Sequence, residues 1–311
     1  MHRCFISRNQ RPKHVAGVYA LGMFDGVHIG HLALIERAVR IAGESGTACG
    51  VYTFDVHPTQ VVCPERAHDA LVSLDDRLDL MESAGVDVAI VHTFDKTLAS
   101  MSPEAFVAHV LHGTLNARCV VVGFDYSFGH GGAGTPAALE LLSRDAGICV
   151  ETLPPVRIDG ATVSSTGVRA ALARGDVEHA ALLLGRRHFV RGTVGRGRGV
   201  GHKLGIPTAN VHVPAGIALP MPGVYACEAR WGSLATAPAV CNIGVRPTFG
   251  DGGRGVTLEV HVMDVAPDLY GASLTVGFAA RLRDEFRFAD PRELVKQIEA
   301  DMIAARRVLG R

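Results

Sequence analysis

The sequence predicts an α/β protein with two domains: an N-terminal α/β domain on a parallel sheet, and a small C-terminal antiparallel β-barrel with a terminal helix. Over residues 15–155, short apolar runs alternate with segments of helical periodicity, which is typical of βαβ units. From Phe189, strand-like runs are broken by Gly and Pro, and helical periodicity returns only at residue 291. The 311 residues are enough for two cores. We therefore expect domains at 1–186 and 187–311.

The elements of the first domain follow from the spacing of its apolar residues. Its apolar runs are rich in Val, Ile and Tyr, as expected for strands covered on both faces of a parallel sheet. Between them, apolar residues recur at helical spacing, and Ser102-Pro103 provides a helix start. The predicted strands are 15–21, 48–54, 87–92, 118–123 and 148–153, and the predicted helices are 30–44, 74–84, 103–112, 136–145 and 176–188.

The composition argues against several classes of function. Lys and Arg together number 31, as do Asp and Glu, so no net field would draw the protein to nucleic acid or to a membrane surface. No apolar run approaches the roughly 18 residues of a membrane helix, and no signal-peptide pattern is visible. The seven cysteines form no Cys-x-x-Cys pair, which favours reduced thiols. We expect a cytoplasmic protein that acts on small molecules, with its oligomeric state left open.

A glycine-punctuated turn, residues 22–31 (GMFDGVHIGH), connects the first predicted strand to an amphipathic helix. The free N–H groups at a helix start suit a phosphate chain, and Gly26 and Gly30 allow its close approach to the backbone. His28 and His31 are three residues apart, so both can point into one pocket and donate hydrogen bonds to a phosphorus centre that gains negative charge. The same spacing suits half of a zinc site, but no nearby cluster of ligands completes it.

Two further predicted strand ends carry polar, glycine-rich residues, 54–58 (FDVHP) and 123–131 (GFDYSFGHG). Ligands of open α/β sheets bind beyond the carboxyl ends of the strands, so these turns and the turn at 22–31 should open onto one cleft. Residues 129–134 formally match the dinucleotide-binding pattern G-x-G-x-x-G. That pattern requires its first glycine directly after the strand, whereas residues 124–128 intervene, so an NAD(P) oxidoreductase is disfavoured.

A second candidate phosphate site precedes the helix-forming run that starts near residue 167. Three hydroxyl side chains and a guanidinium, those of Ser164, Ser165, Thr166 and Arg169, gather at this helix start. They could hold a phosphate group through side-chain and backbone donors. A simple Ser/Thr helix cap is the alternative interpretation.

The second domain begins with the glycine-richest stretch of the chain, 195–205 (GRGRGVGHKLG). It is not a Walker A loop, because Leu204 follows Lys203, but glycines and cations together can form a nest for a polyphosphate. A basic surface hairpin is the alternative. Thr208 and Asn210 then place two side-chain oxygens on one strand face, which suits Mg²⁺ bound together with ATP phosphates.

A later strand carries a candidate catalytic carboxylate. Val256, Leu258 and Val260 alternate with polar residues, so Glu259 and His261 share the polar face of this strand. A carboxylate there could orient or deprotonate a hydroxyl group that attacks a γ-phosphate, although a solvated strand face is the simpler interpretation. The final helix begins near Asp290 and bears an apolar stripe that should close the barrel.

These motifs resemble, in order and spacing, those of the bacterial bifunctional riboflavin kinase/FAD synthetases, over about residues 15–305. The turn at 22–31 is similar to the H-x-G-H signature of nucleotidylyltransferases. Residues 195–210 are similar to the kinase motif ending in Phe-Pro-Thr-Ala-Asn, with His202 in place of an arginine and Ile206 in place of the phenylalanine. The family's other motifs resemble residues 123–129, 164–169, 242–249, 257–261, 269–271 and 281–285.

The resemblance implies a Rossmann-like nucleotidylyltransferase domain and a riboflavin kinase-like barrel. Riboflavin would be phosphorylated to FMN by Mg²⁺-bound ATP, and FMN would then be adenylylated by a second ATP to FAD with release of pyrophosphate. It implies catalytic roles for His28, His31, Arg169 and Glu259, and magnesium ligation by Thr208 and Asn210. The implied binding residues for nucleotide or flavin are Gly22, Phe24, Asp25, Gly26, Gly30, Asp125, Ser164, Ser165, Thr166, Gly197, Gly199, Gly201, Lys203, Asn242 and Arg283.

Two other functions stay open from the sequence. The first domain could transfer a nucleotidyl group to another acceptor, although the attached kinase-like barrel argues against this. Alternatively, the chain could be a flavin- or nucleotide-binding regulator without turnover, which the presence of both histidines and Glu259 disfavours.

Overall fold

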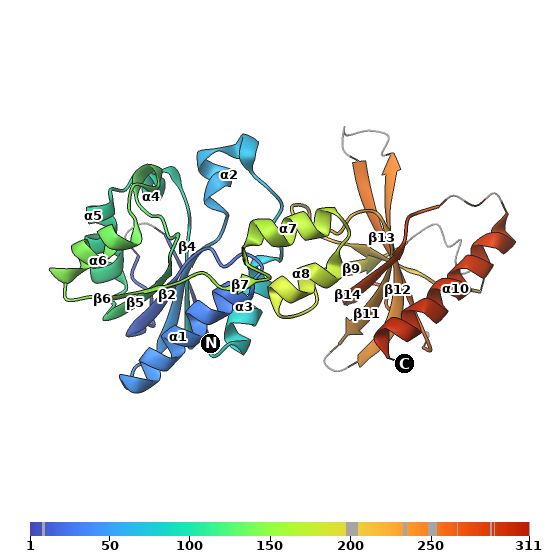
Figure 1. Cartoon of the computed structure of the whole chain (residues 1–311), viewed down its shortest axis with the longest axis horizontal. Helices are drawn as coiled ribbons and strands as arrows, with labels where there is room; N and C mark the ends of the chain where they lie inside the picture. The colour runs from blue at the N-terminus through green and yellow to red at the C-terminus, as the bar shows by residue number, and fades with distance from the viewer. Residues whose placement is uncertain are drawn as a thin grey trace. The chain divides into compact units, whose positions relative to one another are not determined.

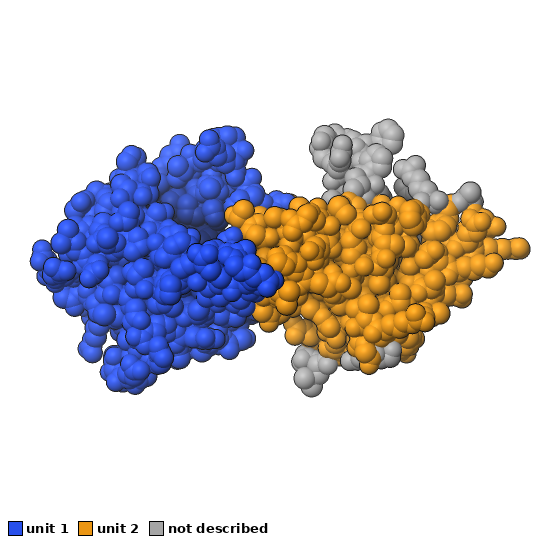
Figure 2. All heavy atoms as spheres, in the orientation of Figure 1, with its two compact units in different colours: residues 1–165 blue, residues 166–311 orange. Residues whose placement is uncertain are grey.

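The computed structural model describes residues 1–7, 10–196, 205–232, 235–247, 254–265, 267–286, 288 and 290–310. Residues 245–247 and 254–256 lie in strands and are described by their backbone alone. Contacts divide the chain into two compact units, unit 1 (Met1–Ser165) and unit 2 (Thr166–Arg311), which are coloured separately in Figure 2.

Unit 1 contains a six-stranded sheet in the order β1-β4-β3-β2-β5-β6, and every pairing in it is parallel (Figure 1). The predicted parallel sheet is therefore confirmed, although the first predicted strand begins at Val18 and not at Val15. β1 was not predicted, because at this sheet edge only Ile6 of its residues is buried. The strands are β1 (His2–Ile6), β2 (Val18–Leu21), β3 (Cys49–Phe54), β4 (Val88–His92), β5 (Cys119–Gly123) and β6 (Cys149–Leu153).

Helices cover both faces of this sheet. Ile35 and Leu78, from α1 and α3, pack on one face, while Phe106 and Leu139, from η2 and α6, pack on the other. The helical segments are α1 (Ile29–Glu44), α2 (Pro58–Val62), η1 (Pro64–Arg66), α3 (Leu74–Ser83), α4 (Lys96–Ala99), α5 (Pro103–Ala105), η2 (Phe106–Thr114), η3 (His130–Gly132) and α6 (Pro136–Arg144), and a small hairpin joins β7 (Arg157–Ile158) to β8 (Ala161–Thr162).

The helix predicted over 103–112 is wrong in type after its first turn. Ser102 caps the short α5 by accepting a hydrogen bond from the Ala105 amide, as its sequence predicts. The chain then continues as the π-helix η2. Its wider turn is visible in the hydrogen bond from the Leu115 amide to the Val110 carbonyl, five residues back.

Unit 2 contains a closed barrel in the order β10-β13-β12-β11-β14-β9, with antiparallel pairings throughout, as predicted. Before it, α8 ends at Leu184, because the C-cap Gly185 has a φ of 70°. The helix predicted over 176–188 therefore ends four residues earlier than predicted. The elements of unit 2 are α7 (Ser165–Ala173), α8 (Val177–Leu184), β9 (Phe189–Gly195), β10 (Ala209–His212), β11 (Gly223–Trp231), β12 (Ala235–Pro247), β13 (Arg254–Val262), β14 (Ser273–Arg283) and α10 (Pro291–Leu309).

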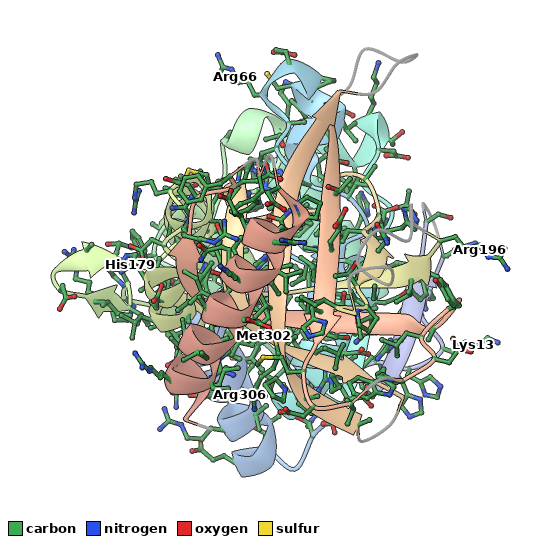
Figure 3. The ribbon with its side chains drawn as sticks, turned by 90° about the vertical axis from the view of Figure 1, so that its right-hand side faces the viewer. Lys13, Arg66, His179, Arg196, Met302 and Arg306 are labelled. Atoms are coloured by element: carbon green, nitrogen blue, oxygen red, sulfur yellow. The ribbon has the colours of Figure 1, made fainter. Side chains whose placement is uncertain are left out.

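The terminal helix α10 packs on the barrel as its apolar stripe predicts. Met302 and Ala305 contact a cluster that includes Val224 and Val240, and Figure 3 shows Met302 on this helix. The carboxylate of Asp290 caps its start by accepting a hydrogen bond from the Arg292 amide. All seven cysteines are free thiols, and none of the described helices combines the length and apolar character that a membrane crossing needs.

Candidate active sites

The turn at 22–31 lies where the order of the parallel strands reverses. From β2 the chain proceeds to its neighbour β3 and then to β4, whereas β5 lies on the opposite side of β2. The carboxyl ends of β2 and β5 therefore flank a topological switch point, the place where open α/β sheets bind their ligands. The turn after β2 and the loop after β5 are thus brought to one edge, as the sequence predicts.

His28 and His31 lie side by side at the start of α1. His28 caps the helix, because its Nδ1 accepts a hydrogen bond from the His31 amide at 3.2 Å. The two rings stack with centroids 3.6 Å apart. A Cβ at Gly30 would lie 3.1 Å from the His28 ring, so this glycine leaves room for the stack. With Nδ1 of His28 accepting, its Nε2 carries the proton and can donate to a ligand.

His31 lies in a site that disfavours its charged form. Burial, together with electrostatic interactions with His28 and Arg77, lowers the pKa of His31 well below its ordinary value. The fully buried Phe24 ring packs edge-on against it, with centroids 5.3 Å apart. Nδ1 of His31 is buried and finds no partner within the described part of the chain. His31 is therefore a neutral imidazole near pH 7.

Arg77 is the residue of this site that sequence reasoning missed. It is 3% exposed, and its guanidinium donates to the Met23 carbonyl at 2.9 Å and to the Phe54 carbonyl. Leu74, Leu78 and Met81 place Arg77 on the apolar face of a predicted helix. A charged residue on the apolar face of a predicted helix was the feature of the sequence that could have indicated a buried arginine.

Asp25 and Gly26 connect the turn to neighbouring loops. Asp25 is 4% exposed, and its carboxylate accepts a hydrogen bond from the Leu71 amide at 2.9 Å. Gly26 has φ of 77°, and a Cβ there would lie 2.6 Å from the Leu71 side chain. The side chains of Phe24 and Asp25 thus shape the turn from within the protein, and Gly22 lies against the Phe24 ring.

The hydroxyl-rich segment begins a helix, as predicted. Ser165 is the first residue of α7, and its hydroxyl donates to the Asp25 carbonyl at 2.8 Å. Ser164 is half-buried, Thr166 is exposed, and Arg169 follows one turn after Ser165 on the same helix. Asp125, in the loop after β5, is exposed beside Gly123, where a Cβ would lie 3.2 Å from its carboxylate.

Three predicted residues of the barrel form one row across three strands. Glu259 of β13 is in register with Asn210 of β10 on one side and with Asn242 of β12 on the other. Residues directly opposite in antiparallel strands point to the same side of the sheet, about 5 Å apart at Cβ. All three are half-buried, while their strand neighbours Leu258 and Val260 are buried. We call Asn210, Glu259 and Asn242 the barrel row.

Neighbouring side chains hold the barrel row in place. The Asn242 amide donates to Glu285 at 3.3 Å, while its own Oδ1 is buried and has no partner among the described residues. A Cβ at Gly244 would lie 2.6 Å from the same Glu285 carboxylate. His261 contacts the Pro207 carbonyl at 2.8 Å, which fixes the segment just before Thr208. Thr208 itself is half-buried and precedes β10 by one residue.

The remaining predicted residues fall into two groups. Arg283 makes a bidentate ion pair with Asp301 of α10, at 2.7 Å for its shortest contact, and Asp301 is 4% exposed. This guanidinium therefore joins α10 to β14. The predictions at Gly197, Gly199, Gly201 and Lys203, and the departure at His202, lie outside the described residues.

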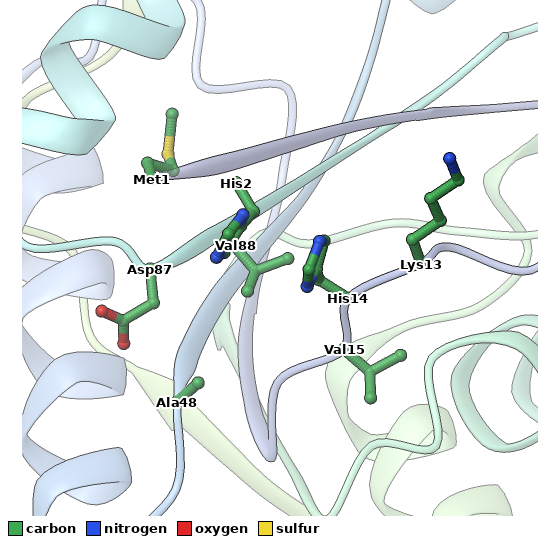
Figure 4. Close-up of a pocket in the computed structure, with 8 residues that line it drawn as sticks. All are labelled: Met1, His2, Lys13, His14, Val15, Ala48, Asp87 and Val88. Carbon is green, nitrogen blue, oxygen red and sulfur yellow. The ribbon is translucent and has the colours of Figure 1, made fainter.

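A cavity of about 640 Å³ lies at the amino edge of the parallel sheet, opposite the switch point (Figure 4). His2 and His14 stack there with centroids 3.9 Å apart. No predicted site residue lines it. Its lining residues are Met1, His2, Lys13, His14, Val15, Ala48, Asp87 and Val88.

Comparisons with known proteins divide the chain in two. The family FAD synthetase matches residues 10–167, and the family riboflavin kinase matches residues 184–309. The helices α7 and α8 span the interval between these matches.

Relatives match along nearly the whole chain. A bifunctional riboflavin kinase/FMN adenylyltransferase of Pseudomonas fluorescens is 39% identical over 298 residues, covering 96% of this chain and 94% of the relative. The protein of the same name from Bacillus subtilis is 36% identical over 295 residues, covering 94% and 92%. A crystal structure from Streptococcus pneumoniae, of a protein named macrolide-efflux protein, is 29% identical with a TM-score of 0.88 and covers 97% of this chain and 99% of that one.

Proposed function

Because this chain belongs to the family of bifunctional riboflavin kinase/FMN adenylyltransferases, we propose a specific role for each of its two candidate sites. The enzyme phosphorylates riboflavin to FMN with ATP, and it then adenylylates FMN to FAD with release of pyrophosphate. We assign adenylyl transfer to residues 1–186 and phosphorylation to residues 187–311. The chosen boundary follows Gly185, which ends α8, and precedes β9.

The adenylyl-transfer site comprises the two histidines at the start of α1. A phosphate oxygen of FMN attacks the α-phosphorus of ATP, and the bond to pyrophosphate breaks as the new P–O bond forms. Nε2–H of His28 and the neutral imidazole of His31 donate to the α-phosphate oxygens, whose negative charge grows in the transition state. The stacked pair at the N-terminus of a 16-residue helix, at a topological switch point, supports this role.

The hydroxyl-rich segment at the start of α7 holds the departing pyrophosphate in this proposal. Ser164, Thr166 and Arg169 provide two hydroxyls and one guanidinium close to the N-terminal amides of the helix. Ser165 acts differently, because its hydroxyl donates to the Asp25 carbonyl and so ties the segment to the turn at 22–31.

In the kinase site, Glu259 accepts the proton of the riboflavin ribityl hydroxyl as this oxygen attacks the γ-phosphorus of a first ATP. Asn242 stands beside Glu259, with a buried oxygen available to a ligand donor. The single observation that carries this assignment is the barrel row, which brings residues from three strands to one place.

Magnesium fits the donors that Thr208 and Asn210 offer. Both are neutral oxygen donors, and Asn210 is in register with the carboxylate of Glu259. Mg²⁺ prefers such oxygens and usually keeps waters and substrate phosphates as its other ligands. When bound, the ion would neutralise charge on the ATP phosphates. Thr208 and Asn210 would hold it on the same side of the barrel as Glu259.

The cellular setting is also a proposal. Seven free thiols favour a reducing compartment, so we propose that the enzyme works in the cytoplasm. Its equal numbers of basic and acidic residues favour small-molecule substrates over nucleic acids as its partners.

A time course with purified enzyme tests the proposed function. The protein is incubated with riboflavin, ATP and Mg²⁺, and riboflavin, FMN and FAD are separated by chromatography. We expect FMN first and FAD after a lag, with neither formed when Mg²⁺ is chelated. FAD formation from supplied FMN but not from riboflavin would contradict the kinase assignment, and the absence of both products would contradict the proposed function.

A further inference from the structure

Arg77 is a buried cation beneath the adenylyl-transfer site, and the mechanism above leaves it without a role. Its Nη1 donates to the Met23 carbonyl at 2.9 Å, and its Nη2 donates to the Phe54 carbonyl. Met23 belongs to the turn after β2, and Phe54 is the last residue of β3. One planar guanidinium from α3 therefore joins the carboxyl ends of two neighbouring strands. A lysine carries the same charge but lacks this rigid fork.

The charges around Arg77 keep it protonated. Burial lowers the pKa of Arg77 to about 10, while the carboxylates of Asp25 and Asp55 favour its charged form. Asp25 is fixed by the Leu71 amide, and Asp55 accepts hydrogen bonds from the Val56 and Phe94 amides. The cation is thus permanent at neutral pH.

The charge of Arg77 reaches His31, to which we assign a catalytic role. Electrostatic interactions with His28, from its own helix start, and with the Arg77 cation, from α3, both oppose protonation of the His31 ring. The backbone of Met23, which Arg77 holds, begins the turn that ends at His31. Arg77 can therefore act on His31 through position and through charge.

We infer that Arg77 is a positioning residue for adenylyl transfer: its buried guanidinium holds the Met23 and Phe54 carbonyls, so it fixes the turn that carries His28 and His31 and places a permanent positive charge behind that turn. This inference rests on the proposed role of His31. It predicts that removal of the cation disturbs the chemistry of FAD formation in a pH-dependent way, whereas riboflavin phosphorylation in unit 2 is unaffected.

The experiment compares Arg77→Met, Arg77→Lys and the matched control Arg40→Met, whose arginine is exposed on α1. For Arg77→Met we expect kcat of FAD formation from FMN to fall about 100-fold, because misplaced catalytic groups cost a factor of this order. The acid limb of its pH profile should move to higher pH, since His31 protonates more readily without the cation. Arg77→Lys should lose kcat about tenfold with the acid limb in place, and Arg40→Met should match the parent enzyme.

A direct titration separates electrostatics from structural damage. NMR of ¹⁵N-histidine-labelled protein, with His31→Gln to assign the signal, should show that His31 titrates at higher pH in Arg77→Met than in the parent or in Arg77→Lys. Riboflavin phosphorylation in the same sample reports the integrity of the barrel. Where Arg77→Met does not fold, Arg77→Lys decides: reduced kcat with an unmoved titration supports the inference, and unchanged kcat or a shifted titration contradicts it.

The two possible failures are distinguishable. If His31→Gln forms FAD at the parent rate, the proposed function of His31 is wrong. If His31→Gln is inactive while Arg77→Met keeps both its kcat and its acid limb, the role of Arg77 is wrong and the proposed function stands.

Discussion

The two candidate sites are built in opposite ways. In unit 1 the turn at 22–31 is held by buried side chains: Asp25 is 4%, His28 6% and Arg77 3% exposed. In unit 2 the barrel row lies half-exposed on a strand face, where strand register and the hydrogen bond from Asn242 to Glu285 align it. The first site depends on buried charge and backbone geometry. The second depends on three half-exposed side chains, each of which can be replaced while the barrel stays folded. Substitutions in the site of unit 1 should therefore lower both activity and stability, whereas substitutions in the barrel row should lower activity and leave stability unchanged.

The largest effect tests this separation in the barrel. Glu259→Gln should lower kcat of riboflavin phosphorylation by about 10²–10⁴-fold, the range for loss of a general base. FAD formation from supplied FMN and the melting temperature should stay at the parent values, because Glu259 is not part of the buried core. Both reactions are followed by flavin chromatography. The matched control is Glu299→Gln on α10, which is exposed; equal losses in the two variants would refute the base assignment.

His28→Ala should lower the rate of FAD formation by about 10²–10³-fold, as expected when a preorganised transition-state donor is lost. Because His28 also caps α1, we expect about 1 kcal/mol less stability of unit 1 in chemical denaturation. Riboflavin phosphorylation should continue. His109→Ala, which removes an exposed histidine of η2, is the control. A variant that loses FAD formation without any loss of stability would break the proposed contrast between the units.

The Arg283–Asp301 pair tests whether buried charge also stabilises unit 2, because this ion pair is buried and lies outside the barrel row. Asp301→Ala leaves a half-buried guanidinium unpaired and should destabilise the barrel by about 3 kcal/mol. Thermal unfolding of the variant measures this loss. If Arg283 binds nucleotide or flavin, as the family resemblance implies, KM for ATP or for riboflavin should also rise. Unchanged stability would show that this ion pair does not hold α10 on the barrel.

The pH dependence of stability compares two histidines, one in each unit, whose pKa values are lowered in the folded protein. Burial lowers the pKa of His31 well below its ordinary value and that of His188 to about 4. Below pH 6.5 the unfolded chain binds protons that these folded imidazoles do not, so stability is lost as pH falls, by about 1.4 kcal/mol per pH unit for each. Denaturant titrations between pH 7 and 4 measure this slope. His188→Gln should flatten it for unit 2 only, and an unchanged slope would exclude His188 as its source.

Asn210→Ala should produce the smallest change. With one of the two neutral oxygen donors removed, riboflavin phosphorylation should need about a tenfold higher Mg²⁺ concentration for half-maximal rate. The loss is modest because Thr208 and the ATP phosphates would still hold the ion. Titration of the kinase rate with Mg²⁺ provides the measurement. An unaltered Mg²⁺ dependence would show that Asn210 does not bind the ion.

Local patterns explain how much of these sites the sequence predicts. His28, His31 and Gly30 lie within four residues at a strand-to-helix turn, so their proximity follows from helix geometry. The α/β alternation and the late Gly- and Pro-broken strands likewise predict the parallel sheet and the barrel. Each of these features depends on neighbours in the chain.

Long-range contacts explain what the sequence does not predict. Arg77 reaches the turn from α3, about 50 positions away, and only its place on an apolar helix face hinted at burial. The alignment of Asn210, Glu259 and Asn242 depends on the register of three strands, which no local period determines. β1 escaped prediction because an edge strand lacks a continuous apolar run.

The most direct test of the central claim, that two separable sites act in sequence, is a mixing experiment. His28→Ala and Glu259→Gln are each incubated alone and then together with riboflavin, ATP and Mg²⁺, and FAD is measured over time. Alone, the first variant should stop at FMN and the second should leave riboflavin unchanged. Together they should form FAD after a lag, because each variant contains the site that the other lacks. No FAD from the mixture, while the first variant still releases FMN and the second still adenylylates supplied FMN, would contradict the account.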